Sequence, residues 1–217
     1  LWRQLLQWLG GLGILILATA ILSQLGVAGA QLMETETQMQ NVNRLTPKIS
    51  RTARLLWGLY VGLTLLLVVI LYLLHLLGAA PNMTLFDAVS HAFTTLSTSG
   101  FSPRPESLGA FSPIVQWTVA GFMALGATSF VLIYLVLQGN VERLAESDEF
   151  RFYIGVLAFF SLGVTVILFL NGTFAGDIER TLRHGVFQVV SITTTTGYAS
   201  TDFTLWSSSA KHLLFIC

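Results

Sequence analysis

Charged residues are scarce in this sequence. Only 10% of its 217 residues are Asp, Glu, Lys or Arg and 53% are hydrophobic, whereas an ordinary soluble domain carries about 25% charged residues. The 11 basic and 11 acidic residues cancel, which gives no general affinity for nucleic acid. Cys217 is the single cysteine, which excludes an intrachain disulfide and the cysteine spacings of zinc sites. These shortages argue against a soluble enzyme and indicate an integral membrane protein.

Long apolar runs are plentiful. A membrane-spanning helix needs about 20 mostly apolar residues, and segments that qualify lie at 5–33, 55–77, 113–138 and 152–170, with another beginning near Trp206. The first segment also imitates a signal peptide around 9–20, but no basic stretch precedes it and the run continues to Leu32, which favours a span. Leu1 is not a methionine and the last residues are apolar, so we expect a segment of a longer protein.

Basic residues predict the orientation of these spans. Arg44, Lys48, Arg51 and Arg54 lie in the connection between the first two spans. Short basic connections stay on the cytoplasmic side. The connections 78–112 and 171–205 are therefore expected on the outer side of the membrane.

The two outer connections contain a repeat. Each has an apolar stretch too short to span, at 85–96 and 182–193, followed by hydroxyl residues, a glycine and an aromatic residue. The two loops read Thr98-Ser99-Gly100-Phe101 and, 97 positions later, Thr195-Thr196-Gly197-Tyr198. The same offset aligns Arg54 with Arg151. The predicted unit is a span, a short helix, a hydroxyl–glycine–aromatic loop and a second span.

This unit suggests a cation pathway. Irregular backbone at membrane depth is tolerated where it is buried in protein or lines a watery cavity. Serine, threonine and glycine supply closely spaced oxygens and permissive backbone angles, and the preceding short helix directs the negative end of its dipole at the loop. Rings of such oxygens replace the hydration shell of a cation.

The residues also resemble a known family. The string Thr195-Thr196-Gly197-Tyr198-Ala199 is similar to the TVGYG filter of potassium channels. Four stretches, at 8–14, 97–102, 148–153 and 193–203, resemble the Trk/Ktr/HKT superfamily of potassium transporters, closest to its Trk branch, and cover essentially the whole chain in family order. The first loop departs from the channel pattern, with Ser99 and Phe101 where valine and tyrosine would stand.

The resemblance implies an all-α integral membrane protein built from tandem span–pore loop–span repeats, four around one pore as in the potassium channel pore fold. Residues 1–50 would hold the last helix of an upstream repeat and a cytoplasmic loop, 51–147 a complete repeat, and 148–217 a truncated next repeat. Two filter strands of four are then present, so this chain alone should not conduct.

The resemblance further implies potassium uptake rather than enzymatic chemistry, with potassium as the substrate and no covalently bound cofactor. Backbone carbonyls would bind the ion, the glycines would permit the geometry, and the aromatic residues would brace the loops from behind. The site residues are Thr98, Ser99, Gly100, Phe101, Thr195, Thr196, Gly197 and Tyr198. The implied partners are a second copy, forming a homodimer, a cytoplasmic nucleotide-binding regulatory subunit of the TrkA type, and the lipid of a bacterial inner membrane.

Other interpretations are open on the residues alone. A secondary transporter of an organic or anionic solute also uses re-entrant loops, although its helix N-termini usually face the substrate. A membrane scaffold would use the hydroxyl loops for packing. His91 is expected to make a structural hydrogen bond, and Asp177 with His184 could form an acid–base pair, although no nucleophile accompanies them.

Overall fold

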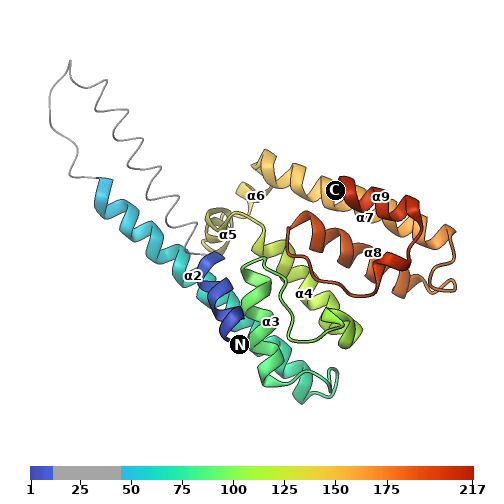
Figure 1. Ribbon diagram of the computed structural model, residues 1–217. Coiled ribbons are helices and arrows are strands. Elements are labelled where there is room, and N and C mark those ends of the chain that lie inside the picture. Colours follow the sequence, from blue (N-terminus) through green and yellow to red (C-terminus); the bar gives the residue numbers. More distant parts are fainter. Residues whose placement is uncertain (12–44) are drawn as a thin grey trace.

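The computed structural model describes residues 1–11 and 45–217 (Figure 1). Every regular element within these ranges is a helix, as the apolar segments predict. Residues 2–11 are helical, and the rest of the predicted span 5–33 lies outside the described residues. The elements that follow are α2 (Leu45–Leu76), α3 (Leu85–Leu96), η2 (Ser107–Ala110), α4 (Pro113–Gly126), α5 (Phe130–Leu137), α6 (Glu142–Glu146), α7 (Asp148–Leu170), α8 (Ile178–Thr193), η3 (Phe203–Leu205) and α9 (Ser208–Ile216).

Two of these helices, α2 and α7, are long and apolar enough to cross a membrane. Their apolar stretches, Arg54–Leu76 and Asp148–Leu170, have 23 residues each, which is about 34 Å of helix against a hydrocarbon core of about 30 Å. Within the most apolar window of each helix, 22% of α2 and 17% of α7 is buried inside the protein. Most of their apolar side chains therefore face outward, as lipid-facing helices require. Helices thus occupy the spans predicted at 55–77 and 152–170.

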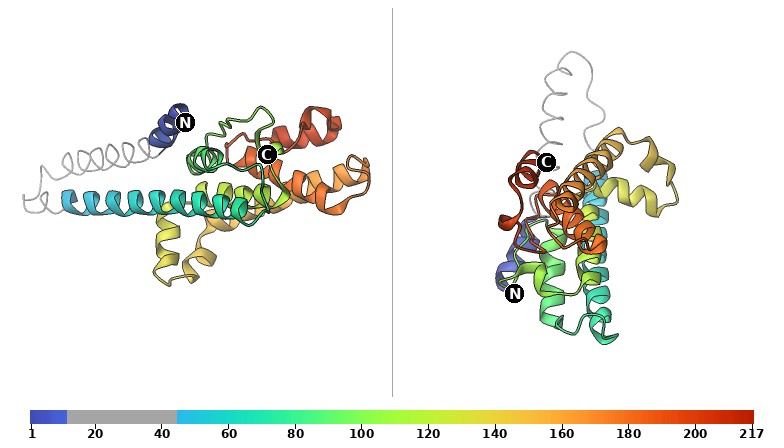
Figure 2. Two further views of the ribbon diagram at one scale, coloured as in Figure 1. Left: turned by 90° about the horizontal axis from the view of Figure 1, so that it is seen from below. Right: turned by 90° about the vertical axis from the view of Figure 1, so that its right-hand side faces the viewer.

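The apolar segment 113–138 was predicted as one span, and this prediction is wrong. α4 ends at Gly126 and α5 begins at Phe130, and both views of Figure 2 show α5 and α6 standing out to one side of the other helices. Glycine is a poor helix former, and the hydroxyls of the following residues compete for backbone acceptors. Thr128 does so, donating to the carbonyl one turn back over 2.9 Å. Neither piece is long enough to span alone.

Two half-helices, α3 and α8, pack against the long helices. α3 occupies the predicted range and begins with a capping box, in which Thr84 and Asp87 exchange hydrogen bonds of 3.1 and 3.2 Å. α8 begins at Ile178, four residues before the predicted start, because the Asp177 side chain caps a polar first turn. α3 contacts α2, α8 contacts α7, and α4 lies between the two half-helices (Figure 1).

The helical residues 2–11 are held against α2 through Trp8. The Trp8 indole donates to the Thr64 hydroxyl over 3.0 Å, and the Tyr60 hydroxyl donates to the Trp8 carbonyl over 3.0 Å. The Trp8 ring also stacks on Phe93 of α3, with 5.2 Å between ring centroids. At the other end, the helix predicted near Trp206 is α9, which begins two residues later. These contacts place the N-terminal end of the chain beside α2 and α3, and α9 at the other end contacts α7 and α8.

Candidate functional site: two hydroxyl–glycine loops

The first loop, residues 97–101, leaves the end of α3 in a sharply turned conformation. The N–H groups of Ser99 and Gly100 both donate to the Thr94 carbonyl, over 2.9 and 3.3 Å, and Thr98 N–H donates to the Thr95 carbonyl over 3.1 Å. Thr98 and Gly100 have positive φ angles of 48° and 64°. Because N–H and C=O point in opposite directions in a trans peptide, the carbonyls of Thr98 and Ser99 point away from the helix end.

The second loop, residues 194–198, repeats this geometry after α8. Thr196 and Gly197 donate to the Ser191 carbonyl over 2.9 and 3.1 Å, and Thr195 donates to the Ile192 carbonyl over 2.9 Å. The positive φ angles fall on Thr195 and Gly197, at 57° and 84°. Each of these positions is 97 residues after its counterpart. The repeat predicted from the sequence is therefore also a repeat of the backbone conformation.

Side-chain hydroxyls at the base of each loop bond within the loop. Ser97 Oγ donates to the Phe93 carbonyl over 2.8 Å and lies 2.9 Å from Ser99 Oγ. In the second loop the hydroxyls of Thr194 and Thr196 lie 2.8 Å apart. These hydroxyls stabilise the turn. The outward-pointing backbone carbonyls are then the oxygens best placed to replace water around a cation.

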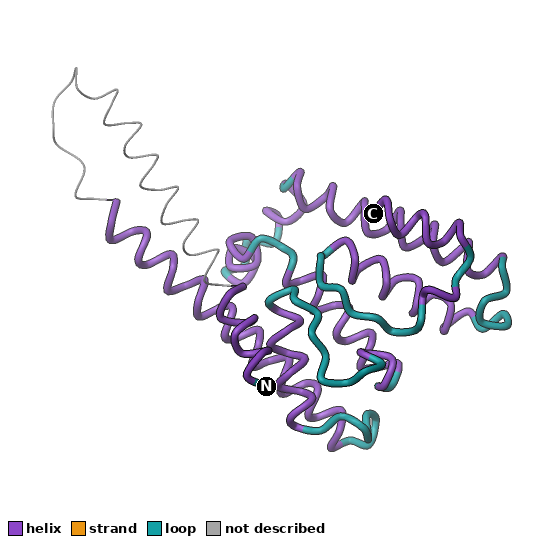
Figure 3. Tube along the Cα trace, in the orientation of Figure 1, coloured by secondary structure: helices purple, strands orange, loops and turns teal. Residues whose placement is uncertain are grey.

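The two loops approach one another closely at Gly100. A Cβ atom at this position would lie 1.9 Å from the Thr196 carbonyl oxygen, far inside any van der Waals contact. Figure 3 shows loop segments running together between the half-helices. Gly197 has the same left-handed conformation, but a Cβ atom there would meet nothing within 4 Å. Sterics thus require glycine at position 100 and conformation favours it there, whereas at 197 conformation alone favours glycine.

The aromatic residues of the two loops behave differently. Tyr198 is fully buried, and its hydroxyl reaches across to α3, 2.5 Å from the Thr94 hydroxyl and 3.2 Å from the His91 carbonyl. Its own carbonyl accepts a hydrogen bond from Ser191 over 2.7 Å. Tyr198 therefore braces the second loop as expected. Phe101 is 39% exposed, with the Arg3 guanidinium 4.7 Å from its ring centroid, so the expected bracing contact is not made among the described residues.

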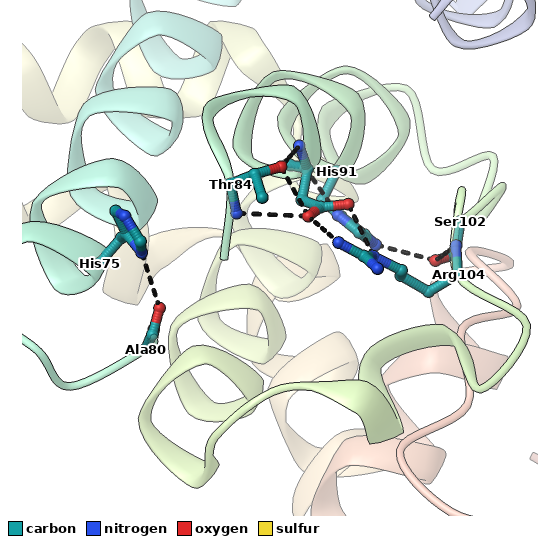
Figure 4. Close-up of polar contacts among 7 residues, drawn as sticks. His75, Ala80, Thr84, His91, Ser102 and Arg104 are labelled. Atoms are coloured by element: carbon teal, nitrogen blue, oxygen red, sulfur yellow. Dashed lines mark hydrogen bonds and ion pairs between the residues drawn. The ribbon is translucent and has the colours of Figure 1, made fainter. Parts of the chain in front are cut away.

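The exit segment of the first loop, residues 102–104, is attached to α3 at two points (Figure 4). His91 Nε2 lies 2.9 Å from Ser102 Oγ, and His91 Nδ1 lies 2.7 Å from the Asp87 carbonyl. The Arg104 guanidinium donates to both carboxylate oxygens of Asp87, over 3.0 and 2.6 Å. His91 therefore makes the structural hydrogen bonds expected of it, and one of them reaches the loop exit.

The sequence pattern does not indicate the Asp87–Arg104 ion pair. Burial by itself raises the pKa of Asp87, but hydrogen bonds from Arg104 and Thr84 outweigh it and hold the pKa below its usual value. The carboxylate is thus charged at neutral pH. The only related pattern in the sequence is the Thr84-x-x-Asp87 capping motif. This motif locates Asp87 at the start of a helix but does not indicate that its partner lies 17 residues later.

The exit segment of the second loop, residues 199–201, is attached to α8 by a neutral pair. His184 Nδ1 lies 2.8 Å from Ser200 Oγ, and the Arg183 guanidinium lies 3.4 Å from His184 Nε2. Burial, with the charges of Arg183 and Arg180, lowers the pKa of His184 to about 4. Asp177 is occupied in capping α8, so the suggested Asp177–His184 acid–base pair is not formed.

Proteins similar to this chain over nearly its whole length are potassium uptake proteins. The chain is 37% identical over 220 residues to the Trk system potassium uptake protein TrkH of Halomonas elongata, covering 99% of this chain and 43% of that protein. It is 35% identical over 208 residues to the Trk system potassium uptake protein TrkH of Escherichia coli K12, covering 94% of this chain and 41% of the relative. The chain thus spans less than half the length of these relatives.

A solved structure and a family model agree with these relatives. The crystal structure of the potassium transporter TrkH from Vibrio parahaemolyticus matches with a TM-score of 0.80 and 31% identity, over 99% of this chain and 42% of that chain. The family model TrkH, described as a cation transport protein, matches residues 1–217. With two candidate membrane spans and a matched region that covers the whole sequence, the chain belongs to the TrkH family of membrane cation transport proteins.

Proposed function

We propose that the protein containing this chain takes up potassium across a membrane through a pore to which the two loops contribute. The observation that carries this proposal is the meeting of the loops at Gly100 and Thr196, each at the C-terminal end of a half-helix. Both helix dipoles direct their negative ends at this region, which favours a cation. The relatives named above are potassium uptake proteins.

The filter residues in this proposal are those predicted from the sequence: Thr98, Ser99, Gly100, Phe101, Thr195, Thr196, Gly197 and Tyr198. Carbonyl oxygens that point away from the helix ends would replace part of the hydration shell of potassium. Hydrogen bonds from the loop amides to Thr94 and Ser191 keep the positive ends of those peptide dipoles turned inward. Such a site would attract cations and repel anions, and this argues against an anionic solute.

The matching backbone of the loops also supports tandem span–pore loop–span repeats, with 1–50, 51–147 and 148–217 as the last helix of one repeat, a complete repeat and part of a third. The side of Gly197 that is open corresponds to the side on which Gly100 meets Thr196. A following repeat would place its own strand there. Repetition of this contact would arrange the strands in a ring around one pore.

The sidedness, location and partners follow from the same proposal. The basic N-terminal end of α2, with Arg51 and Arg54, would face the cytoplasm, and both loops would open toward the outer side of a bacterial inner membrane. The names of the relatives describe parts of a Trk system. A homodimer and a nucleotide-binding regulatory subunit on the cytoplasmic side are the partners we propose.

Rubidium uptake by the full-length parent protein, in cells that lack their own potassium importers, tests this function. We expect uptake by the unaltered protein and its loss in Gly197→Ser, because serine disfavours the left-handed backbone that the loop needs. Gly155→Ser is the matched control, because Gly155 lies on the exposed side of α7 with open space around it.

The control variant should transport normally. Full transport by Gly197→Ser at normal membrane levels would remove the second loop from the pathway. A full-length protein that inserts into the membrane but carries no cation would favour the scaffold or the carrier of another solute.

A further inference from the structure

The exit of the first loop is connected to α3 through a short chain of polar groups (Figure 4). The Asp87 carbonyl can only accept, so His91 Nδ1 donates to it and His91 Nε2 is the acceptor for the Ser102 hydroxyl. The Ser102 oxygen in turn accepts the Arg104 N–H over 3.0 Å. Each group in this series of hydrogen bonds can act only as the donor or only as the acceptor toward its neighbour. The exit segment therefore has a single well-defined position against α3.

The Asp87–Arg104 ion pair adds a second, charged attachment. The Asp87 side chain is 1% exposed and the Arg104 side chain 42% exposed. Two parallel hydrogen bonds of the guanidinium fix both distance and orientation. Because Thr84 holds the same carboxylate through its N–H and hydroxyl, over 3.2 and 2.7 Å, the first turn of α3 serves as the fixed support.

The second loop has the same connection made from different residues. His184 stands 97 positions after Asp87, in the second turn of α8, and holds Ser200 in the exit segment. Both exits use a histidine–serine pair, His91–Ser102 and His184–Ser200, although the two histidines are not repeat counterparts, and the first exit adds an ion pair. What the two repeats share is therefore a half-helix side chain that holds the segment just beyond the glycine. This coincidence indicates a requirement for holding the exit rather than a local packing preference.

We infer that Asp87 and His91 are positioning residues that, through Arg104 and Ser102, keep the outer end of the first loop in place and thereby set discrimination between potassium and sodium. The inference rests on the proposed function. Selectivity depends on the number and placement of oxygens around the ion, and functional groups must be held within about 0.5 Å by the residues that support them. Releasing the exit segment lets the carbonyls of Thr98 and Ser99 relax toward the smaller ion.

The test measures sodium and rubidium uptake by the full-length protein and its Arg104→Gln variant in cells without other potassium importers. We expect the sodium-to-rubidium uptake ratio to rise by about threefold, a change of the size that corresponds to the energy of one partly exposed ion pair. The membrane level of the variant should be unchanged. Arg151→Gln is the matched control, since Arg151 is an exposed arginine whose ion pair, with Asp148 over 3.8 Å, lies within the first turn of α7. Its ratio should equal that of the unaltered protein.

The outcomes separate the inference from the function on which it rests. An unchanged ratio per molecule in Arg104→Gln, with or without a lower membrane level, overturns the positioning role and leaves potassium uptake standing. Absence of rubidium uptake by the unaltered protein overturns both. Should Arg104→Gln fail to reach the membrane, Ser102→Ala decides, because it removes one hydroxyl and no charge. An unchanged ratio in that variant likewise refutes the inference.

Discussion

The Tyr198 hydroxyl lies 2.5 Å from the Thr94 hydroxyl, although the two residues are separated by 104 positions in the chain. Tyr198 ends the second loop, and Thr94 lies on the half-helix that precedes the first. The Thr95 hydroxyl approaches the same oxygen at 3.4 Å. One buried side chain therefore joins the two sequence repeats directly behind their loops.

Replacing Tyr198 with phenylalanine should weaken this junction. The ring stays buried, but Thr94 and the His91 carbonyl lose a buried partner, which should lower the free energy of unfolding by about 1 kcal/mol. Thermal unfolding of the purified full-length protein measures the effect. Tyr134→Phe is the control, because its hydroxyl bonds the exposed Gln138, and its midpoint should barely change. Equal shifts in both variants would contradict the role of Tyr198.

Gly100→Ala should be far more damaging. The new methyl group would overlap the Thr196 carbonyl, and alanine also disfavours the positive φ. We therefore expect the free energy of unfolding to fall by about 3 kcal/mol or more. Rubidium uptake should be lost as well. Gly155→Ala, on the exposed side of a helix, should leave stability unchanged or slightly higher. A Gly100→Ala protein with normal stability would show that the two loops lie further apart in the full-length protein.

Gly197→Ala distinguishes an open from a closed ring of loops. If a following strand occupies the open side of Gly197, alanine there should cost about as much stability as Gly100→Ala. If that side stays empty, only the conformational penalty of about 1 kcal/mol remains. Unfolding of the two variants of the full-length protein, measured side by side, decides between these cases. We expect similar losses, and a clearly milder Gly197→Ala would contradict the ring.

Stability should fall on acidification between pH 6.5 and 4. His184 has a folded-state pKa of about 4, against about 6.5 in the unfolded chain. In this window the unfolded state binds a proton at His184 that the folded state does not. The contribution of neutral His184 to the free energy of unfolding is therefore complete above pH 6.5 and is lost as the pH falls toward 4. His184→Asn can keep a bond to Ser200 but does not titrate. Its unfolding midpoint should depend less on pH than that of the unaltered protein, and an identical pH profile would refute the assignment.

Gln116→Leu should destabilise the contact between α4 and α8. The Gln116 side chain is 3% exposed and donates to the carbonyls of Leu108 and Phe111 over 3.0 and 3.1 Å, while its oxygen accepts from Arg183. Leucine would leave a buried guanidinium short of a partner, at a cost of about 3 kcal/mol. The exposed Gln138→Leu is the control and should change the unfolding midpoint little.

The sequence predicts the repeating elements well because their signals are local. The range 85–96 is apolar on one face and follows a capping pattern, so the helix boundaries match those of α3. The 97-residue offset between the glycines needs only a comparison of the chain with itself. α8 was predicted four residues short, because its first turn at Ile178 is polar and hydropathy alone does not include it.

Features that depend on distant residues could not be predicted in this way. The Asp87–Arg104 pair requires the chain to leave α3, turn through the loop and return along the same helix. Sequence periodicity indicates local secondary structure and cannot predict such a path. The break after Gly126 was missed because Ala127, Thr128 and Ser129 are common inside membrane helices when their hydroxyls bond back to the preceding turn. Hydropathy measures length and apolarity, and it does not show where backbone hydrogen bonds stop.

The break between α4 and α5 has a consequence for how the helices can move. The Ala124 carbonyl, freed where α4 ends, accepts the Thr128 hydroxyl over 2.9 Å and the Tyr153 hydroxyl of α7 over 3.1 Å. A carbonyl without a hydrogen-bond partner in lipid would favour a continuous helix, in which it accepts a backbone N–H. These two hydroxyls satisfy the carbonyl without a continuous helix. Since one of these hydroxyls belongs to α7, the joint between α4 and α5 is also tied to a neighbouring long helix.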